Sequence, residues 1–135
     1  MANRIGIGVL VSGSGSNLQS IIDNIEGGRL NAEIRIVISN NPDAHALQRC
    51  RNHGVPGIVI DHHEFPTRED FDHAVIAKLK AAKIDLVVLA GFMRILSADF
   101  FHAFPMQIMN IHPALLPSFP GTGVQKKAVE YGVKF

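Results

Sequence analysis

The feature that most constrains the fold is a regular alternation of short apolar runs with segments of helical periodicity. The runs are rich in β-branched residues and predict five strands, at 4–11, 33–39, 57–61, 84–90 and 107–111. Apolar runs without polar alternation are typical of strands that are buried on both faces. The pattern therefore predicts a parallel sheet covered by helices on both sides.

The segments between these runs carry apolar residues at three- and four-residue intervals, which predicts helices. They lie at 17–26, 42–52, from 68 onward, 97–104 and 124–131. Asn41 is expected to cap the second helix, with Pro42 in its first turn, and Thr67 to cap the third. Glycines at 27–28 and Gly54 are expected to end the first two helices. The buried face of the third would hold Phe71, Val75, Ile76 and Leu79.

Right-handed crossovers then make an α/β, Rossmann-like doubly wound sheet, mainly parallel, the expected fold for 1–135 as one domain. With 47% hydrophobic and 19% charged residues, the composition excludes general disorder. A net charge of +1 gives no reason to expect nucleic acid or a membrane as partner. No apolar stretch is long enough to span a bilayer, and one cysteine forms no internal disulfide, so a cytoplasmic protein is expected.

The first strand is followed by a run of small polar residues, Ser-Gly-Ser-Gly-Ser-Asn at 12–17, which leads directly into a helix. Small residues permit a tight turn, and the helix start offers free N–H groups and a partial positive charge. A phosphate monoester is the natural occupant. The run lacks the spacing of the dinucleotide fingerprint and the lysine of the Walker loop. The alternative is a flexible turn with a Ser or Asn cap.

The fourth strand is followed by Gly-Phe-Met-Arg-Ile-Leu at 91–96. An apolar loop with one guanidinium suits a flat heteroaromatic ligand that carries a carboxylated tail. The alternative is a core loop with a solvated Arg94.

The fifth strand ends at Asn110-Ile111-His112, and residues two apart on a strand share a face. An amide donor beside an imidazole suits oxyanion stabilisation and proton handling in acyl transfer. The other histidines receive no role. His62 and His63 are adjacent and no third ligand is evident, so no metal is expected. Cys50 is expected to be inert helix packing.

The three segments, Ser-Gly-Ser-Gly-Ser-Asn-Leu at 12–18, Leu-Ala-Gly-Phe-Met-Arg-Ile-Leu at 89–96 and Asn-Ile-His-Pro-Ala-Leu-Leu-Pro at 110–117, resemble the phosphoribosylglycinamide formyltransferases in order and spacing. The resemblance implies transfer of a formyl group from 10-formyltetrahydrofolate to the amine of glycinamide ribonucleotide in purine synthesis. It implies that Asn110 and His112 flank the formyl carbon. The implied phosphate ligands are Gly13, Ser14, Gly15, Ser16 and Asn17. The implied folate-binding residues are Arg68, Leu89, Met93, Arg94, Ile95, Leu96 and Asn110.

Members of this family continue beyond the length of this chain, and a catalytic aspartate lies in their later part. The chain is therefore expected to be the amino-terminal portion of the catalytic domain, with phosphate affinity but little transfer activity of its own. A homodimer is a further expectation, because a shortened sheet exposes an apolar edge.

Several alternatives share parts of this pattern. A formyltetrahydrofolate hydrolase has the same Asn-x-His centre but usually carries a preceding regulatory domain, and the serine-rich loop favours a nucleotide substrate over water. A formyltransferase acting on methionyl-tRNA would need a basic extension. A Rossmann-type oxidoreductase needs an acidic residue after the second strand, where this chain has Ser39, Asn40 and Asn41. The remaining alternative is a non-catalytic fragment that binds a nucleotide or a folate.

Overall fold

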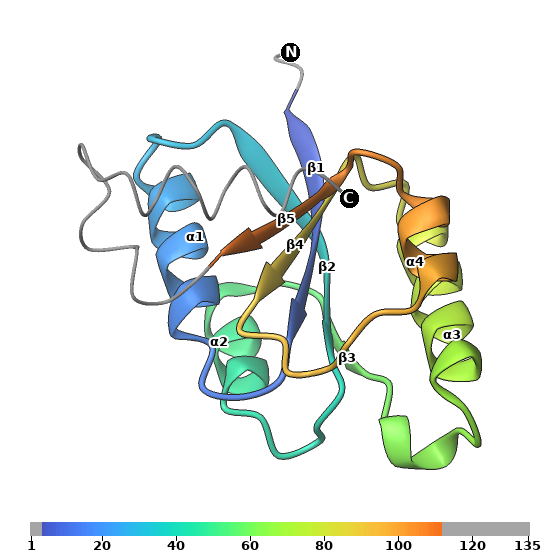
Figure 1. Cartoon of the computed structure of the whole chain (residues 1–135). Helices are drawn as coiled ribbons and strands as arrows, with labels where there is room; N and C mark the ends of the chain where they lie inside the picture. The colour runs from blue at the N-terminus through green and yellow to red at the C-terminus, as the bar shows by residue number, and fades with distance from the viewer. Residues whose placement is uncertain (1–3, 112–135) are drawn as a thin grey trace.

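The computed structural model describes residues 4–111, which form a five-stranded parallel sheet (Figure 1). The strands are β1 (Ile5–Val11), β2 (Ala32–Ser39), β3 (Gly57–Val59), β4 (Leu86–Ala90) and β5 (Ile108–Ile111). Their spatial order is β3-β2-β1-β4-β5, and every neighbouring pair is parallel. The predicted fold class is confirmed, and all five predicted strands are present, some of them shorter than expected.

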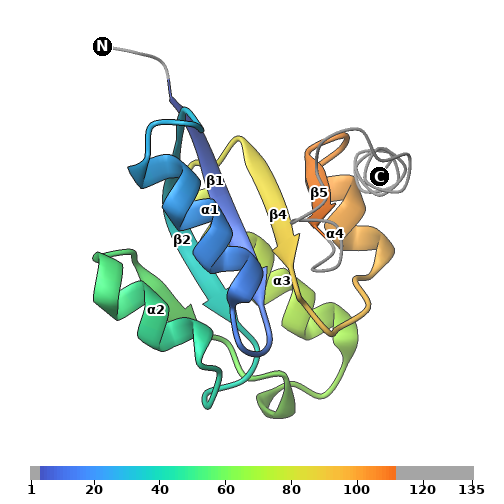
Figure 2. The same ribbon diagram turned by 90° about the vertical axis from the view of Figure 1, so that its left-hand side faces the viewer.

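Helices cover both faces of the sheet: in Figure 1, α1 and α2 lie on one side of it and α3 and α4 on the other. Figure 2 shows the sheet from the side that α1 and α2 cover. The helices are α1 (Ser16–Glu26), α2 (Ala46–His53), α3 (Arg68–Ala81) and α4 (Ala98–Ala103), with a short 3₁₀ turn η1 (His62–Glu64) before α3. One buried cluster joins the sheet to α1 and α2, and a second joins its other face to α3 and α4. None of the helices within 4–111 is long and apolar enough to cross a membrane.

The central strand β1 supplies side chains to both clusters. Val9 and Val11 enter the first and Leu10 the second, and all three are fully buried. Each such side chain contributes about 1.5–3 kcal/mol of transfer free energy when it leaves water. Gly8 lets α3 approach closely, because a Cβ there would lie 2.6 Å from Cδ2 of Leu79. Continuous apolar sequence in β1 thus reflects burial on both sides.

The predicted helix ends are mostly confirmed. Gly27 ends α1, and Gly54 ends α2 in the left-handed conformation, with φ of 67°. The buried face of α3 holds Phe71, Val75 and Leu79 as expected, with Ile76 half-buried. Asp72 is also fully buried on this face, which the sequence analysis missed; its Oδ2 accepts a hydrogen bond from the Ser97 N–H at 2.6 Å, at the start of α4.

The predicted start of α2 was wrong. The Oδ1 of Asn41 accepts from the Asp43 N–H at 3.0 Å, and the Asn41 carbonyl accepts from the Ala44 N–H, so Asn41 closes a turn. The Ser39 hydroxyl holds the Asn41 N–H at 3.0 Å and reinforces that turn. The helix begins only at Ala46. The predicted helix at 124–131 lies outside the described residues.

Replacing Thr67 with Ala should lower the free energy of unfolding by about 1 kcal/mol, the usual effect of losing an N-cap. The Thr67 hydroxyl accepts from the Asp70 N–H at 3.0 Å, which satisfies one free donor at the start of α3. Urea denaturation followed by circular dichroism measures the change. Thr67→Ser keeps the hydroxyl and should stay close to the wild type; an equal loss in both variants would remove the cap as the cause.

Candidate functional site

The predicted loops meet at the point where the order of the strands in the sheet reverses. The chain leaves β1 toward β2 on one side, and later returns to place β4 on the other side of β1. Ligands of such sheets bind beyond the carboxyl ends of the strands at this point. A hollow of about 200 Å³ lies there, which we call the loop hollow. Its lining is made by residues 12–17 together with Ala90, Gly91 and Met93.

The loop before α1 has its carbonyl groups turned toward α2. The Gly13 carbonyl accepts from the Ala46 N–H at 3.1 Å, and the Ser14 carbonyl accepts from Nε of Arg49 at 2.8 Å. All described peptides are trans, so the next N–H points opposite to each carbonyl. The N–H groups of Ser14 and Gly15 therefore point away from α2, which leaves them free to meet an anion.

The first turn of α1 adds further donors. Its first helical hydrogen bond runs from the Gln19 N–H to the Gly15 carbonyl at 2.8 Å, so the three preceding N–H groups have no acceptor within the helix. Gly15 allows the tight turn with φ of 78°, and a Cβ there would lie 2.6 Å from Cβ of Ala46. Loop and helix together form a set of N–H donors suited to a compact anion.

Ser12 joins three strand ends by one buried hydroxyl. It donates to Oδ1 of Asn40 after β2 at 2.6 Å and accepts from the Met93 N–H after β4 at 2.8 Å. Asn40 in turn lies 3.2 Å from Nδ1 of His62, through its own Nδ2. This bracing role of Ser12 was not evident in the sequence, where it is one of three serines in a polar run.

The loop after β4 exposes two of its predicted folate-binding side chains and buries a third. Met93 and Ile95 are 82% and 72% exposed, whereas Leu96 packs in the core cluster with α3 and α4. Arg94 is not simply solvated, because its guanidinium carbon lies 5.6 Å from the ring centre of Phe71. Its Nε is buried and has no hydrogen-bond partner among residues 4–111. The loop thus presents apolar side chains around an anchored cation.

The end of β5 lies against both loops. Asn110 is half-buried and pairs in register with Leu89 of β4. Nδ2 of Asn17, in the first turn of α1, donates to the Ile111 carbonyl at 3.4 Å. Asn17 is itself buried, and its Oδ1 has no partner within the described part of the chain. The predicted anion loop and the strand end that carries Asn110 are therefore in direct contact. His112 lies outside the described residues.

Arg68, the remaining predicted site residue, is the first residue of α3 and is exposed. Because α3 follows β3 and η1, its start lies at the same edge of the sheet as the loops (Figure 1).

The pair His62-His63 has a third possible ligand, which the sequence analysis did not see. One ligand atom from each of Asp61, His62 and His63 lies within 4.8 Å of the others. Oδ1 of Asp61 already accepts from the backbone N–H of His63, and this hydrogen bond holds the pKa of Asp61 below its ordinary value. Cys50 is buried in the first core cluster, and burial raises the pKa of its thiol, which disfavours the reactive thiolate.

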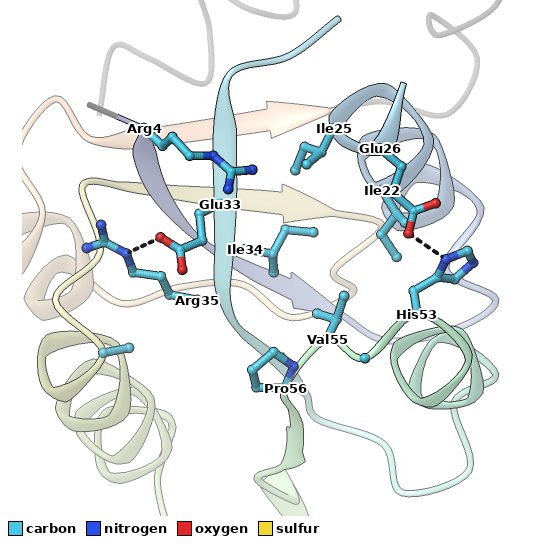
Figure 3. A pocket seen from close by; sticks show the side chains of 12 residues that line it. Arg4, Ile22, Ile25, Glu26, Glu33, Ile34, Arg35, His53, Val55 and Pro56 are labelled. Carbon is cyan, nitrogen blue, oxygen red and sulfur yellow. Dashed lines mark hydrogen bonds and ion pairs between the residues drawn. The ribbon is translucent and has the colours of Figure 1, made fainter. Parts of the chain in front are cut away.

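A larger hollow, of about 610 Å³, lies at the opposite edge of the sheet (Figure 3). Its carboxylates already have partners: Oε2 of Glu26 lies 2.8 Å from Nδ1 of His53, and Oε1 of Glu33 lies 3.5 Å from Nε of Arg35. Arg4 donates to the Ala32 carbonyl at 2.6 Å. Between these groups the lining includes Ile22, Ile25, Ile34, Val55 and Pro56.

The fold defines the class: a Rossmann-like α/β protein with a loop rich in N–H donors at the switch point of its parallel sheet. The chain belongs to the formyl transferase family, whose model matches residues 6–135. It is 47% identical over 133 residues to the trifunctional purine biosynthetic protein adenosine-3 of Drosophila melanogaster, covering 97% of this chain. It is 41% identical over 128 residues to the phosphoribosylglycinamide formyltransferase of Escherichia coli (strain K12), covering 95% of this chain.

Solved structures agree with this assignment. The glycinamide ribonucleotide transformylase 1 of Symbiobacterium toebii superposes with a TM-score of 0.80 at 46% identity, covering 99% of this chain and 63% of that one. The chain spans 60% of the length of the Escherichia coli relative and 10% of the Drosophila melanogaster relative.

Replacing Ser12 with Ala should lower the free energy of unfolding by about 1–3 kcal/mol, because Oδ1 of Asn40 loses its donor in a buried position and the Met93 N–H loses its acceptor in a partly buried one. Thermal and urea unfolding measure the loss. Ser20→Ala in α1 is the matched control, since the Ser20 hydroxyl makes no hydrogen bond within 4–111. A Ser12 variant as stable as this control would contradict the bracing role.

Proposed function

We propose that the protein containing this chain transfers a formyl group from 10-formyltetrahydrofolate to the amine of glycinamide ribonucleotide, a step of purine biosynthesis. One contact carries the proposal: Asn17 in the anion loop donates to the Ile111 carbonyl, one residue after Asn110. A phosphate-binding loop and an oxyanion donor at one edge suit an acceptor with a phosphate at one end and an amine at the other. Family membership and the names of the relatives support the same reaction.

In this proposal the phosphate of the nucleotide binds the loop hollow. Its ligands would be Gly13, Ser14, Gly15, Ser16 and Asn17, mostly through backbone N–H groups. Backbone donors at a helix start bind a phosphate without needing a lysine or arginine. This suits a chain whose loop contains no basic residue between positions 12 and 17.

The folate would bind beside the loop after β4. Exposed Met93 and Ile95 supply apolar contact for a flat ring, and Arg94 and Arg68 supply positive charge for its carboxylated tail. Leu89 and Leu96, which pack in the core cluster behind that loop, would form its floor. Asn110, beside Leu89 in the sheet, would lie between the folate and the nucleotide.

The chemistry follows from these positions. The amine nitrogen attacks the formyl carbon, and the carbonyl electrons move onto oxygen. The Asn110 amide donates to that oxyanion, and His112 accepts the proton lost by the amine. The oxyanion then re-forms the carbonyl as the C–N bond to the folate breaks; the electron pair of that bond goes to the folate nitrogen, and that nitrogen takes up a proton. Holding both substrates at one edge contributes through proximity and orientation.

A hydrolase of the same family would release formate by attack of water on the same carbon. The anion loop favours the nucleotide acceptor, because water needs no set of phosphate donors. That no nucleic acid or membrane takes part, that the protein is cytoplasmic, and that it forms a homodimer stay predictions.

Replacing Asn110 with Ala should lower kcat about 100-fold, the effect of removing one oxyanion donor. His112→Ala should also abolish transfer while sparing nucleotide affinity. The assay is formyl transfer by the protein that carries this chain, followed by absorbance of the folate product. Asn52→Ala is a control, because Asn52 is exposed on α2 and bonds only Gln48 among the described residues. Undiminished turnover in the Asn110 variant would remove it from the mechanism.

Separate titrations of glycinamide ribonucleotide and a folate analogue should both show binding, each measurable by calorimetry. Nucleotide binding alone would favour a nucleotide-binding fragment. Folate binding with formate release and no nucleotide affinity would favour the hydrolase. Affinity for neither would contradict the proposal.

A further inference from the structure

We propose that Arg49 of α2 is a positioning residue for phosphate: it fixes the orientation of the Ser14–Gly15 peptide without touching the ligand. The proposal rests on the phosphate site of the proposed function. Arg49 lies behind the loop and is not part of the lining of the loop hollow. Its effect would therefore pass through the loop backbone.

The contacts of Arg49 bridge the loop and the first helix. Nε donates to the Ser14 carbonyl at 2.8 Å, and Nη1 donates to Oε1 of Gln19 on α1 at 3.1 Å. The side chain is half-buried, and its Cδ lies 3.2 Å from the place where a Gly15 Cβ would stand. One planar guanidinium thus holds two segments in a fixed relation, which a lysine with its single ammonium does not reproduce.

The orientation of this peptide decides the charge that the ligand meets. Glycine flanks Ser14 on both sides, and glycine adopts conformations that other residues avoid, so the peptide has little local restraint. With the carbonyl held by Arg49, the Gly15 N–H points away from α2. If the peptide rotated, its carbonyl oxygen would face the phosphate, and a donor would become a repulsive acceptor.

The two loop peptides differ in how they are held. The Gly13 carbonyl accepts from a backbone N–H, that of Ala46, which no side-chain substitution removes. The Ser14 carbonyl depends on a side chain alone. Arg49 is thus the part of this arrangement that mutation can test.

Further hydrogen bonds hold Gln19, the second partner of Arg49. Nε2 of Gln19 lies 2.9 Å from Oδ1 of Asp23 and 3.2 Å from Nε2 of His53. The other ring nitrogen of His53 lies 2.8 Å from Oε2 of Glu26, the pair drawn in Figure 3. Because the carboxylate only accepts, Nδ1 of His53 donates, and Nε2 is left to accept from Gln19. This chain of hydrogen bonds keeps Oε1 of Gln19 directed toward Arg49.

The test is a titration of the purified chain with inorganic phosphate, followed by the amide NMR signals of Ser14 and Gly15. Arg49→Gln should weaken binding about tenfold, the size expected for one charge-assisted hydrogen bond. Arg49→Lys, which keeps the charge, should stay at least several-fold weaker than the wild type. Arg51→Gln is the matched control, with the same charge change on the same helix; Arg51 bonds only Gln48 among the described residues.

A second variant guards against a fold defect. Gln19→Met leaves Arg49 in place and removes its second anchor, so phosphate affinity should fall in the same direction by a smaller factor. Urea unfolding of each variant establishes that the compared proteins are folded.

Three results would overturn the proposal: equal losses in Arg49→Gln and Arg51→Gln, full recovery in Arg49→Lys, or no response of the loop amides of the wild type to phosphate. The first two would reduce Arg49 to a source of positive charge. Phosphate binding that depends on Arg49, with no added affinity for glycinamide ribonucleotide, would support this proposal and contradict the proposed function.

Discussion

The hydroxyl of Ser12 is the interaction on which the site depends. It lies at the end of the central strand and connects Asn40 after β2 to the backbone after β4. The loops of a parallel sheet leave their strands independently, so some contact must fix them relative to one another. The buried Ser12 hydroxyl, which donates once and accepts once, fixes these loops at the point where the order of the strands reverses. The loop hollow is therefore lined on one side by residues 12–17 after β1 and on the other by residues at the end of β4 and after it.

The late start of α2 has a functional consequence. The residues before Ala46 belong to the turn at Asn41, so α2 begins next to Gly13 and Gly15 and does not extend past them. Its first N–H and its Arg49 side chain then reach the two loop carbonyls. A helix that began at Pro42 would place different residues there. The turn at Asn41, where a helix start was predicted, is therefore part of what orients the loop before α1.

The sequence predicted every described strand and all four helices in their order along the chain, because hydrophobic periodicity and capping residues are local signals. Thr67 and Gly54 acted as expected. The burial of Asp72 was not predicted, although Asp72 lies on the same face of α3 as Val75 and Ile76. A carboxylate is expected at the surface unless a hydrogen-bond partner is known. That partner, the Ser97 N–H, lies 25 residues away. Arg49 was missed for the same reason: its role exists only once α2 packs against the loop, 35 residues earlier.

The site divides its tasks between backbone and side chains. N–H groups, whose directions are set by α2 and by the start of α1, would bind the phosphate, so many loop sequences could serve if glycine stays at position 15. The proposed chemistry would need a particular side chain, that of Asn110, whose position depends on β5, the outermost strand of the described sheet on that side. Among the strands within residues 4–111, β5 pairs with β4 alone, and the hydrogen bond from Asn17 to the Ile111 carbonyl connects its end to α1. In the proposed function, the loop before α1 would therefore also help to position the strand that carries Asn110, and the Asn17 amide would couple nucleotide binding to catalysis.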